Sequence, residues 1–178
     1  PALAHWKYPG LRKPFFHQRQ TVDFLTKHRR CFCFNDMGSG KTSSVLWATE
    51  YLRSLGHVRR TLILSPLSTL KVVWHDEMFY INPSQEVAIA HGSKKKRDAA
   101  FEGDANYVVT NHDALRLIDP KALAEMFDHV VVDELGVFRT WQSGSMPQRY
   151  KNLYALAHDV RVKRFWGLTG TPTPNGPF

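Results

Sequence analysis

A glycine-rich run at residues 35–42, Asn-Asp-Met-Gly-Ser-Gly-Lys-Thr, has the residue types and spacing that bind a triphosphate. It follows a short apolar run and precedes an amphipathic one, which is the strand, turn and helix order of a phosphate-binding loop. Gly38 and Gly40 allow the backbone to approach phosphate oxygens, so that successive N–H groups and the positive end of the new helix face the anion. We expect Lys41 to reach the β- and γ-phosphates of ATP and Thr42 to bind Mg²⁺.

One position of this loop departs from the strict pattern, because Asn35 stands where the pattern has glycine. A glycine-rich turn that binds no ligand is therefore the alternative for this segment. The loop residues that we expect to contact the nucleotide are Asp36, Met37, Gly38, Ser39, Gly40, Lys41 and Thr42.

Two adjacent carboxylates, Asp133 and Glu134, follow the apolar run at 130–132. Asp133 would bind Mg²⁺, directly or through water, and Glu134 would orient or deprotonate the attacking water. A solvent-facing acidic turn is the alternative when this segment is considered alone. Hydrolysis of Mg²⁺-bound ATP needs both the loop and the carboxylates, so their joint presence favours the catalytic interpretation.

Two further segments carry polar groups that suit the same ligand. The amide of Gln18 can pair with the N6 and N7 edge of adenine, and the alternative is an exposed glutamine on a helix. Near the other end of the chain, Thr169 and Thr171 flank Gly170 after the last apolar run. These residues can contact both the γ-phosphate region and a neighbouring surface, although such a turn is common.

Six short runs of β-forming residues alternate with helical patterns, and several are apolar at consecutive positions, as strands covered on both faces are. This alternation predicts an α/β fold with a doubly wound, mainly parallel sheet and helices on both faces. Because ligands gather at the carboxyl ends of such strands, the glycine loop, Asp133 and Thr169 should form one site. The runs are 31–34, 61–64, 87–90, 107–110, 130–133 and 165–169.

Two helical segments are clear from their apolar spacing. The first follows the glycine loop, ends at Gly56 and turns four side chains inward, namely Val45, Ala48, Leu52 and Leu55. The second starts at Pro147 and turns three side chains inward, namely Tyr150, Leu153 and Ala157.

Length and composition limit the class of protein. The 178 residues suffice for a single domain over 1–178, and 43% hydrophobic and 22% charged residues are ordinary for a globular protein. No apolar run approaches the about 18 residues of a membrane span, and no signal peptide starts the chain, so we expect no membrane partner. Cys31 and Cys33 predict reduced core thiols, because a C-x-C pair cannot form a disulfide framework.

The net charge of +8 favours a polyanionic partner such as nucleic acid. The one basic run, residues 94–97, is either a solvated helix start or a phosphate contact. Five tryptophans and eleven phenylalanines could stack on bases, but core packing is the default for most of them. Trp141, in the loop after the acidic pair, is the aromatic residue for which exposure is most worth testing.

The order of these segments resembles the first RecA-like motor domain of superfamily-two helicases, and within them the Swi/Snf-like DNA-dependent ATPases, including phage and bacterial members. The resemblance covers nearly the whole chain, and Trp74 and Glu77 stand at the family spacing. The matching segments are residues 14–25, 35–42, 62–77, 108–115, 130–136 and 167–176.

The resemblance implies a RecA-like P-loop fold and a role for each matching residue. Gln18 looks like the adenine-reading glutamine, Lys41 and Thr42 like the phosphate and Mg²⁺ ligands, and Asp133 and Glu134 like the Mg²⁺-binding and water-activating acids. Residues that resemble the motifs tracking the nucleic-acid backbone are Ser65, Ser68, Thr69, Thr110 and Asn111. Residues that resemble the motif coupling hydrolysis to lobe movement are Thr169, Gly170 and Thr171.

Two departures from the family matter. Gly136 replaces the histidine of the D-E-x-H motif, which puts one coupling contact in doubt. The sequence also stops soon after Pro172, before the second RecA-like lobe, which supplies the arginine fingers and half of the DNA track in this family. Such an arginine is worth about 10³ to 10⁵ in rate in GTPases, so we expect this chain alone to bind ATP weakly and to hydrolyse it slowly or not at all.

The leading hypothesis is an ATP-binding lobe that couples hydrolysis to movement along double-stranded DNA, with ATP and Mg²⁺ as ligands and a second lobe as partner. A nucleotide-gated nucleic-acid-binding module without useful catalysis is the alternative, and a small-molecule P-loop kinase is a weaker one. The resemblance implies a cytoplasmic protein of a bacterium or phage, or a nuclear protein in a eukaryote.

Overall fold

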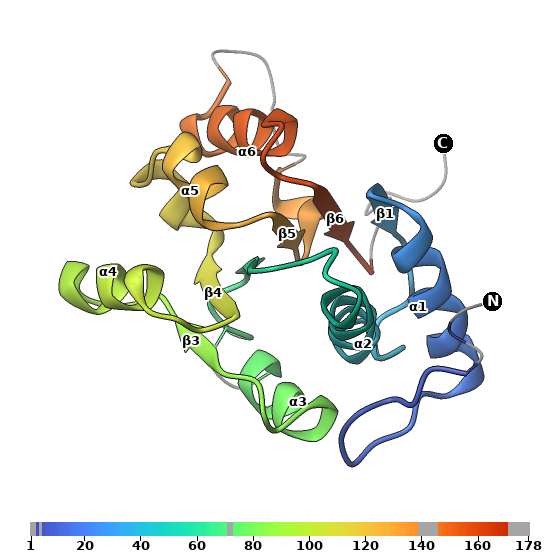
Figure 1. Ribbon diagram of the computed structural model, residues 1–178. Coiled ribbons are helices and arrows are strands. Elements are labelled where there is room, and N and C mark those ends of the chain that lie inside the picture. The colour runs from blue at the N-terminus through green and yellow to red at the C-terminus, as the bar shows by residue number, and fades with distance from the viewer. Residues whose placement is uncertain (1–2, 4, 71–72, 139–145, 171–178) are drawn as a thin grey trace, which may run out of the picture.

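The computed structural model describes residues 3, 5–70, 73–138 and 146–170 (Figure 1). Its centre is a sheet of six strands in the order β1-β6-β5-β2-β4-β3, and every neighbouring pair is parallel. Each predicted run became a strand whose ends differ from the prediction by at most one residue. The strands are β1 Arg30–Cys33, β2 Thr61–Ser65, β3 Val87–Ile89, β4 Tyr107–Asn111, β5 His129–Val132 and β6 Arg164–Leu168.

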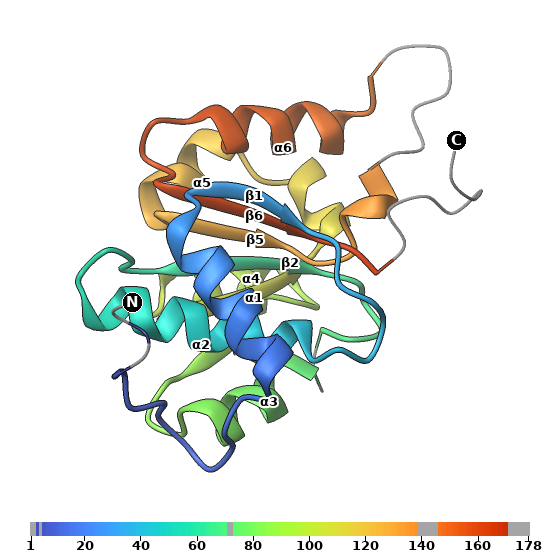
Figure 2. The same ribbon diagram turned by 90° about the vertical axis from the view of Figure 1, so that its right-hand side faces the viewer.

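Helices cover both faces of this sheet, which confirms the doubly wound fold. In Figure 2 the first three helices lie below the strands and α6 lies above them. The lower layer contains α1 Phe16–Lys27, α2 Lys41–Ser54 and α3 Val73–Ile81. The upper layer contains α4 Lys94–Glu102, α5 Pro120–Met126 and α6 Gln148–His158, with the short 3₁₀ helices η2 His112–Arg116 and η3 Leu135–Phe138. None of the helices described is long and apolar enough to cross a bilayer.

The strands are apolar at consecutive positions because helices cover both faces of the sheet. All five residues of β2 are buried, and Ile63 packs into the lower core whereas Leu62 and Leu64 pack into the upper one. Side chains alternate between faces along a strand, so a strand covered on both faces needs an apolar residue at nearly every position.

The helix that follows the glycine loop corrects one prediction. Leu55 is 51% exposed, because α2 ends at Ser54 and Leu55 lies beyond its last turn. Residues 43–52 are all buried, since α2 lies between α1, α3 and the sheet and has no solvent face along that stretch. In α6 the prediction was correct: Leu153 is buried, and Tyr150 and Ala157 pack against the upper core.

The aromatic residues divide into two groups. Three tryptophans, Trp47, Trp74 and Trp166, are fully buried, as the core default predicts. The default is wrong for several phenylalanines. Phe32 on the edge strand β1 and Phe34, directly after that strand, are both more than half exposed. Trp141 lies outside the described residues.

The cysteines of β1 are free thiols, as predicted, although only Cys33 is fully buried. Burial raises the pKa of both thiols, that of Cys31 to about 11, so both stay protonated and unreactive at neutral pH.

Arginines at the amino ends of the strands account for part of the positive charge. Arg30 donates to the carbonyl of Ala157 in the last turn of α6, and Arg164 donates to that of Thr26 in the last turn of α1. Arg60 likewise donates to carbonyls at and beyond the end of α4. Cations are favourable at helix C-termini. The net charge of +8 is therefore partly structural, and it is weaker evidence for a polyanionic partner than the composition alone implies.

Candidate nucleotide-binding site

The glycine loop connects β1 to α2 at the carboxyl edge of the sheet. Gly38 and Gly40 have φ angles of +76° and +73°, the left-handed region that glycine adopts without strain. A Cβ on Gly40 would lie 2.1 Å from Nε2 of Gln18, so a larger residue there would displace the end of that side chain. A Cβ on Gly38 would meet nothing within 4 Å, so the backbone of the loop is open to a ligand at that point.

Lys41, the first residue of α2, folds its side chain back across the loop. Its Nζ donates to the carbonyls of Asn35 and Asp36, both at 2.8 Å. The same ammonium lies 3.4 Å from the position that a Cβ on Gly170 would take. The lysine thus lies between the phosphate loop and the segment after β6. Thr42 follows it in the first turn of the helix and is half-buried.

Asp133 directly follows β5, and its N–H donates to the carbonyl of Leu64 at 2.8 Å. One carboxylate oxygen accepts from the N–H of Glu134 at 3.0 Å, and the other has a long contact of 3.4 Å with the Ser65 hydroxyl. Burial, together with the charge of Glu134, raises the pKa of Asp133 to about 6. The positive charge of Lys41 opposes this rise in the pKa of Asp133.

Glu134 has the only positive φ angle, +49°, of any non-glycine residue in the described part of the chain. Its side chain is exposed at the same edge of the sheet. Left-handed backbone at a residue other than glycine costs about 1–3 kcal/mol and concentrates at functional sites. The backbone therefore turns immediately after Asp133 and gives the two carboxylates different surroundings, Asp133 being half-buried and Glu134 exposed.

Gln18 is buried, with 7% exposure, which excludes the exposed helical glutamine in this structure. Its Oε1 accepts from the N–H of Phe15 at 2.9 Å, and its Nε2 lies against Gly40. The side chain therefore joins the start of α1 to the phosphate loop. Contact with adenine stays a prediction.

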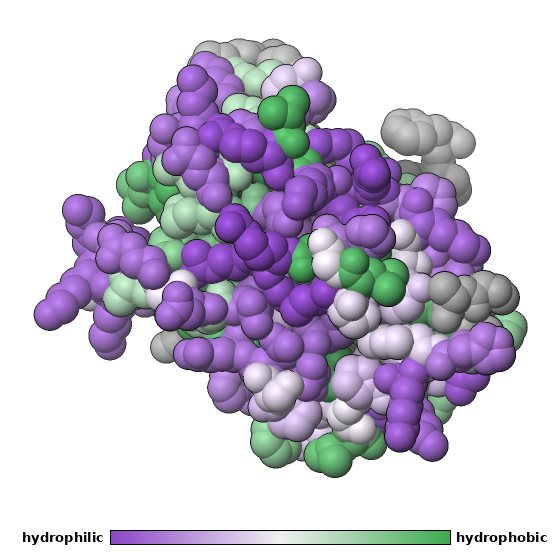
Figure 3. Space-filling model, in the orientation of Figure 1, coloured by the Kyte–Doolittle hydropathy of each residue, from purple (hydrophilic) through white to green (hydrophobic). Residues whose placement is uncertain are grey.

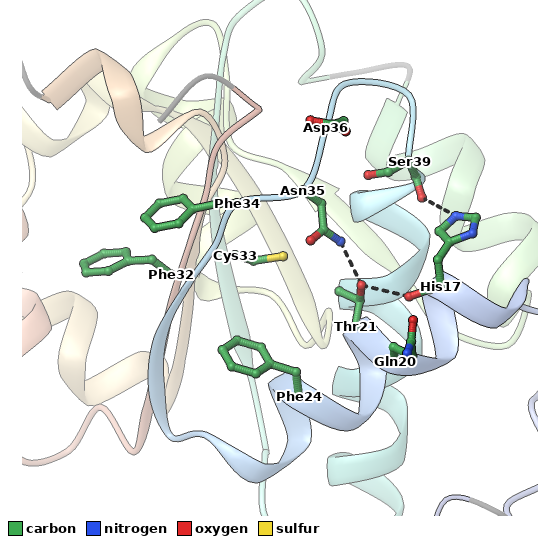
Figure 4. Close-up of a pocket in the computed structure, with 10 residues that line it drawn as sticks. All are labelled: His17, Gln20, Thr21, Phe24, Phe32, Cys33, Phe34, Asn35, Asp36 and Ser39. Carbon is green, nitrogen blue, oxygen red and sulfur yellow. Dashed lines mark hydrogen bonds between the residues drawn. The ribbon is translucent and has the colours of Figure 1, made fainter. Parts of the chain in front are cut away.

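Helix α1 contacts the phosphate-binding loop through hydrogen bonds that the sequence did not predict. Asn35 Nδ2 donates to the Thr21 hydroxyl at 2.7 Å, and a ring nitrogen of His17 lies 3.2 Å from the carbonyl of Ser39 (Figure 4). The side-chain amide of Asn35, at the position where the strict pattern has glycine, therefore holds the loop to α1. These residues line a cavity of about 780 Å³ beside the loop, together with Gln20, Phe24, Phe32, Cys33, Phe34 and Asp36.

The segment after β6 reaches the loop as predicted. The N–H of Thr169 donates to the carbonyl of Cys33 at 3.1 Å, next to the start of the loop. A Cβ on Gly170 would lie 2.8 Å from Cγ of Met37, so the two segments approach closely at this glycine. Thr171 lies outside the described residues.

The residues predicted to track nucleic acid separate into two groups. Ser65 and Thr110 are 0% and 1% exposed, and the Thr110 hydroxyl donates to the carbonyl of Ala90 at 2.9 Å. Direct contact of these two hydroxyls with a nucleic-acid backbone is wrong for this structure, because both are enclosed and bonded within the protein. Ser68 is exposed, and Thr69 and Asn111 are half-buried at the same edge of the sheet.

His112 is a site neighbour that the sequence did not single out. Its Nε2 lies 2.8 Å from the carbonyl of Asp133, and its ring packs edge-on against Phe138 at 5.4 Å. Burial lowers the pKa of His112, so the ring is neutral and can donate to that carbonyl. The one sequence signal for His112 is its position directly after Asn111, in a segment that matches the family.

We expect Asp133→Asn to stabilise the fold. Because the pKa of Asp133 is raised in the folded state, the ionised side chain costs stability as pH rises from about 4 to above 6. The free energy of unfolding should therefore increase by about 1–2 kcal/mol in the variant at pH 8 and by much less at pH 4. Urea denaturation at both pH values measures this difference. A variant that is destabilised more at pH 8 than at pH 4 would contradict the assignment of Asp133 as a desolvated carboxylate.

Comparison with known proteins agrees with this geometry. The SNF2-related domain family matches residues 17–177. Protein p41 of Acyrthosiphon pisum secondary endosymbiont phage 1 is 30% identical over 165 residues, which are 90% of this chain and 36% of that protein. ATP-dependent helicase fft2 of Schizosaccharomyces pombe is 31% identical over 150 residues, which are 79% of this chain and 11% of that protein.

The fold also matches a solved structure. The Sulfolobus solfataricus SWI2/SNF2 ATPase core in complex with double-stranded DNA superposes with a TM-score of 0.77 and 22% identity, covering 93% of this chain and 33% of that chain. The chain thus spans about a third of the length of the phage relative and of this structure. The resemblance inferred from the six sequence segments is confirmed, and the chain belongs to the SNF2-related family of helicase-like ATPase domains.

Proposed function

We propose that this chain is the ATP-binding lobe of a nucleic-acid-dependent ATPase that couples hydrolysis to movement along double-stranded DNA. The observation that carries the proposal is the convergence of Lys41, Asp133 and Gly170 at one edge of the sheet, although they come from three separate segments. Nucleotide hydrolysis requires a phosphate cradle, a metal-binding carboxylate and a group that positions water, and this edge holds a candidate for each.

The residues present fit a Mg²⁺-bound triphosphate. The Ser39 hydroxyl in the loop is buried and has no hydrogen-bond partner among the described residues, and the backbone at Gly38 is open, so the loop has unused polar capacity. Thr42 and Asp133 would hold Mg²⁺, which would neutralise charge on the transferred phosphoryl group. No cluster of three or more metal-ligating side chains occurs in the described residues, but Mg²⁺ commonly takes one or two protein ligands and completes its shell with phosphate and water.

Different residues of this chain would carry out different parts of the reaction. Lys41 would exchange its two loop carbonyls for phosphate oxygens, which are stronger acceptors. Glu134, exposed beside Asp133, is placed to accept a proton from a water or to orient it. Gly170 lies close to Met37 of the loop and to Lys41, so a change in phosphate occupancy would reach the segment after β6.

Double-stranded DNA is the proposed track. Support comes from the S. solfataricus structure, which was solved with double-stranded DNA, and from polar groups along the carboxyl edge, notably Ser68 and Asn111. Hydrophilic side chains also project over α4, at the left of Figure 3, where Lys94, Lys95 and Lys96 are exposed. Contacts with phosphate rather than bases would give little sequence preference.

The similarity to a phage protein supports action in the cytoplasm of a bacterial cell; in a eukaryote the nucleus would be the corresponding place. A second RecA-like lobe is the proposed partner, because the relatives extend well beyond the length of this chain.

Lys41→Met should raise the Kd for ATP in the presence of Mg²⁺ by more than about tenfold, because the ammonium is the only phosphate-binding cation inside the described loop. Lys27→Met is the matched control, since Lys27 pairs with Asp23 at the far end of α1. Isothermal titration calorimetry on the 178-residue chain measures both variants. Equal affinities for wild type and Lys41→Met would remove the phosphate-loop assignment.

Glu134→Gln distinguishes an enzyme from a nucleotide-gated binding module. In a protein that carries both lobes, we expect the parent to hydrolyse ATP and the variant to bind ATP without releasing phosphate, because the amide cannot accept the proton of water. Phosphate release and retention of labelled ATP measure the two properties. A parent that is already inert would favour the module.

Binding of double-stranded DNA to this chain should weaken steeply between 50 and 200 mM salt, as about 0.9 counterions are released per phosphate contact. Ser68→Glu should lower the affinity several-fold, whereas Ser84→Glu, an equal charge change at an exposed serine between α3 and β3, should lower it less. Fluorescence anisotropy of labelled DNA measures both the salt dependence and the effects of the two variants. Salt-independent binding, or equal effects of the two variants, would refute the proposed track.

A further inference from the structure

Two side chains one turn apart on α3 reach opposite halves of the nucleotide site. Trp74 and Glu77 are spaced i, i+3, and such residues lie on the same face of a helix. Trp74 is completely buried and is directed toward the acidic motif, whereas Glu77 is directed toward the phosphate-loop helix. The proposed chemistry does not require Trp74 or Glu77 to contact ATP.

The connection to the acidic half runs through a hydroxyl group. Trp74 Nε1 donates to Ser65 Oγ at 2.9 Å, and that oxygen lies 3.4 Å from Oδ2 of Asp133 and 2.9 Å from the hydroxyl of Thr69. A serine hydroxyl has one proton and two lone pairs. Because the indole N–H occupies one lone pair, the serine keeps its proton and one lone pair for its two other neighbours. The proton can be donated to Asp133, and the remaining lone pair can accept from the Thr69 hydroxyl.

The connection to the phosphate-loop half runs through Glu77. Its Oε2 accepts from the Ser43 hydroxyl at 2.6 Å, and Ser43 directly follows Thr42 in α2. Its Oε1 accepts from Arg12 at 2.8 Å, and the Arg12 guanidinium lies over the ring of Tyr80, 3.9 Å from its centroid. The carboxylate therefore joins α3 to the first turn of α2 and to the segment that precedes α1.

We propose that Trp74 and Glu77 are positioning residues that fix the acidic motif and the phosphate-loop helix to one rigid element, and so set the geometry in which Mg²⁺ and the triphosphate are held together. This inference rests on the proposed function. A metal that bridges a protein carboxylate and a phosphate requires its ligands to be placed within about 0.5 Å, and two ligands on separate loops need a common support to achieve that. Helix α3 provides the support.

The two connections predict different binding defects. Trp74→Phe keeps most of the buried ring but removes the N–H, so it should weaken ATP binding in Mg²⁺ by about 5- to 10-fold, the effect of one hydrogen bond, and leave binding in EDTA within about twofold. Ser65→Ala removes the hydroxyl in the same connection and should reproduce this pattern. Glu77→Gln should weaken ATP binding both in Mg²⁺ and in EDTA, because it acts on the phosphate-loop helix.

Matched controls exist in the chain. Trp47 is 1% exposed, and its Nε1 has no hydrogen-bond partner among the described residues, so Trp47→Phe makes the same change in volume without breaking a bond. Glu125→Gln removes a carboxylate that pairs with Arg161 at 2.8 Å away from the site. Urea denaturation of each variant shows whether a loss of affinity follows from a loss of folding.

Calorimetric titration of the 178-residue chain with ATP, in Mg²⁺ and in EDTA, decides among the outcomes. A selective loss of affinity in Mg²⁺ for Trp74→Phe and Ser65→Ala, absent from Trp47→Phe, supports the inference. Equal behaviour of Trp74→Phe and Trp47→Phe, with wild type binding ATP measurably, overturns the inference and leaves the proposed function intact. A wild-type chain with no affinity for ATP in Mg²⁺ overturns both.

Discussion

The partly desolvated carboxylate of Asp133 is the group on which the site depends. It sits at the end of a fully buried strand, beside a second acid, in surroundings that raise its pKa to about 6. A carboxylate in such a place costs folding free energy unless a cation joins it. The surrounding groups, namely the N–H of Glu134, the Ser65 hydroxyl and the charge of Lys41, compensate only in part. The contacts around Asp133 therefore leave its charge incompletely compensated.

The parallel sheet makes this arrangement possible. Parallel strands place all their carboxyl ends at one edge, so the loop after β1, the acid after β5 and the glycine after β6 lie at the same edge although they are distant in the sequence. Strand order matters as well, because β6 lies between β1 and β5, and the segment after it reaches the phosphate loop. At the opposite edge, arginines bind the ends of helices, so the basic residues there stabilise the scaffold rather than mark a ligand site.

Much of this could be predicted from the sequence, because strand periodicity and the glycine loop are local signals. All six strands were predicted, since a strand buried on both faces has a run of apolar residues. The exposure of Leu55 depends on where α2 ends, and the exposure of Phe32 depends on which strand lies at the edge of the sheet. Neither feature is encoded by the residues nearby in the sequence. Ser65 and Thr110 match motif positions, but only the folded chain shows that their hydroxyls are enclosed. The link from Trp74 through Ser65 to Asp133 joins three segments and has no signature within any one of them.

Electron paramagnetic resonance of Mn²⁺, used in place of Mg²⁺, tests the central claim most directly. If Lys41, Thr42, Asp133 and Glu134 surround one metal–triphosphate complex, the chain should bind a single Mn²⁺ when ATP is present, and that binding should be lost in Asp133→Asn. Mn²⁺ that binds equally well to wild type and to Asp133→Asn, or that stays free in solution with ATP, would contradict the account.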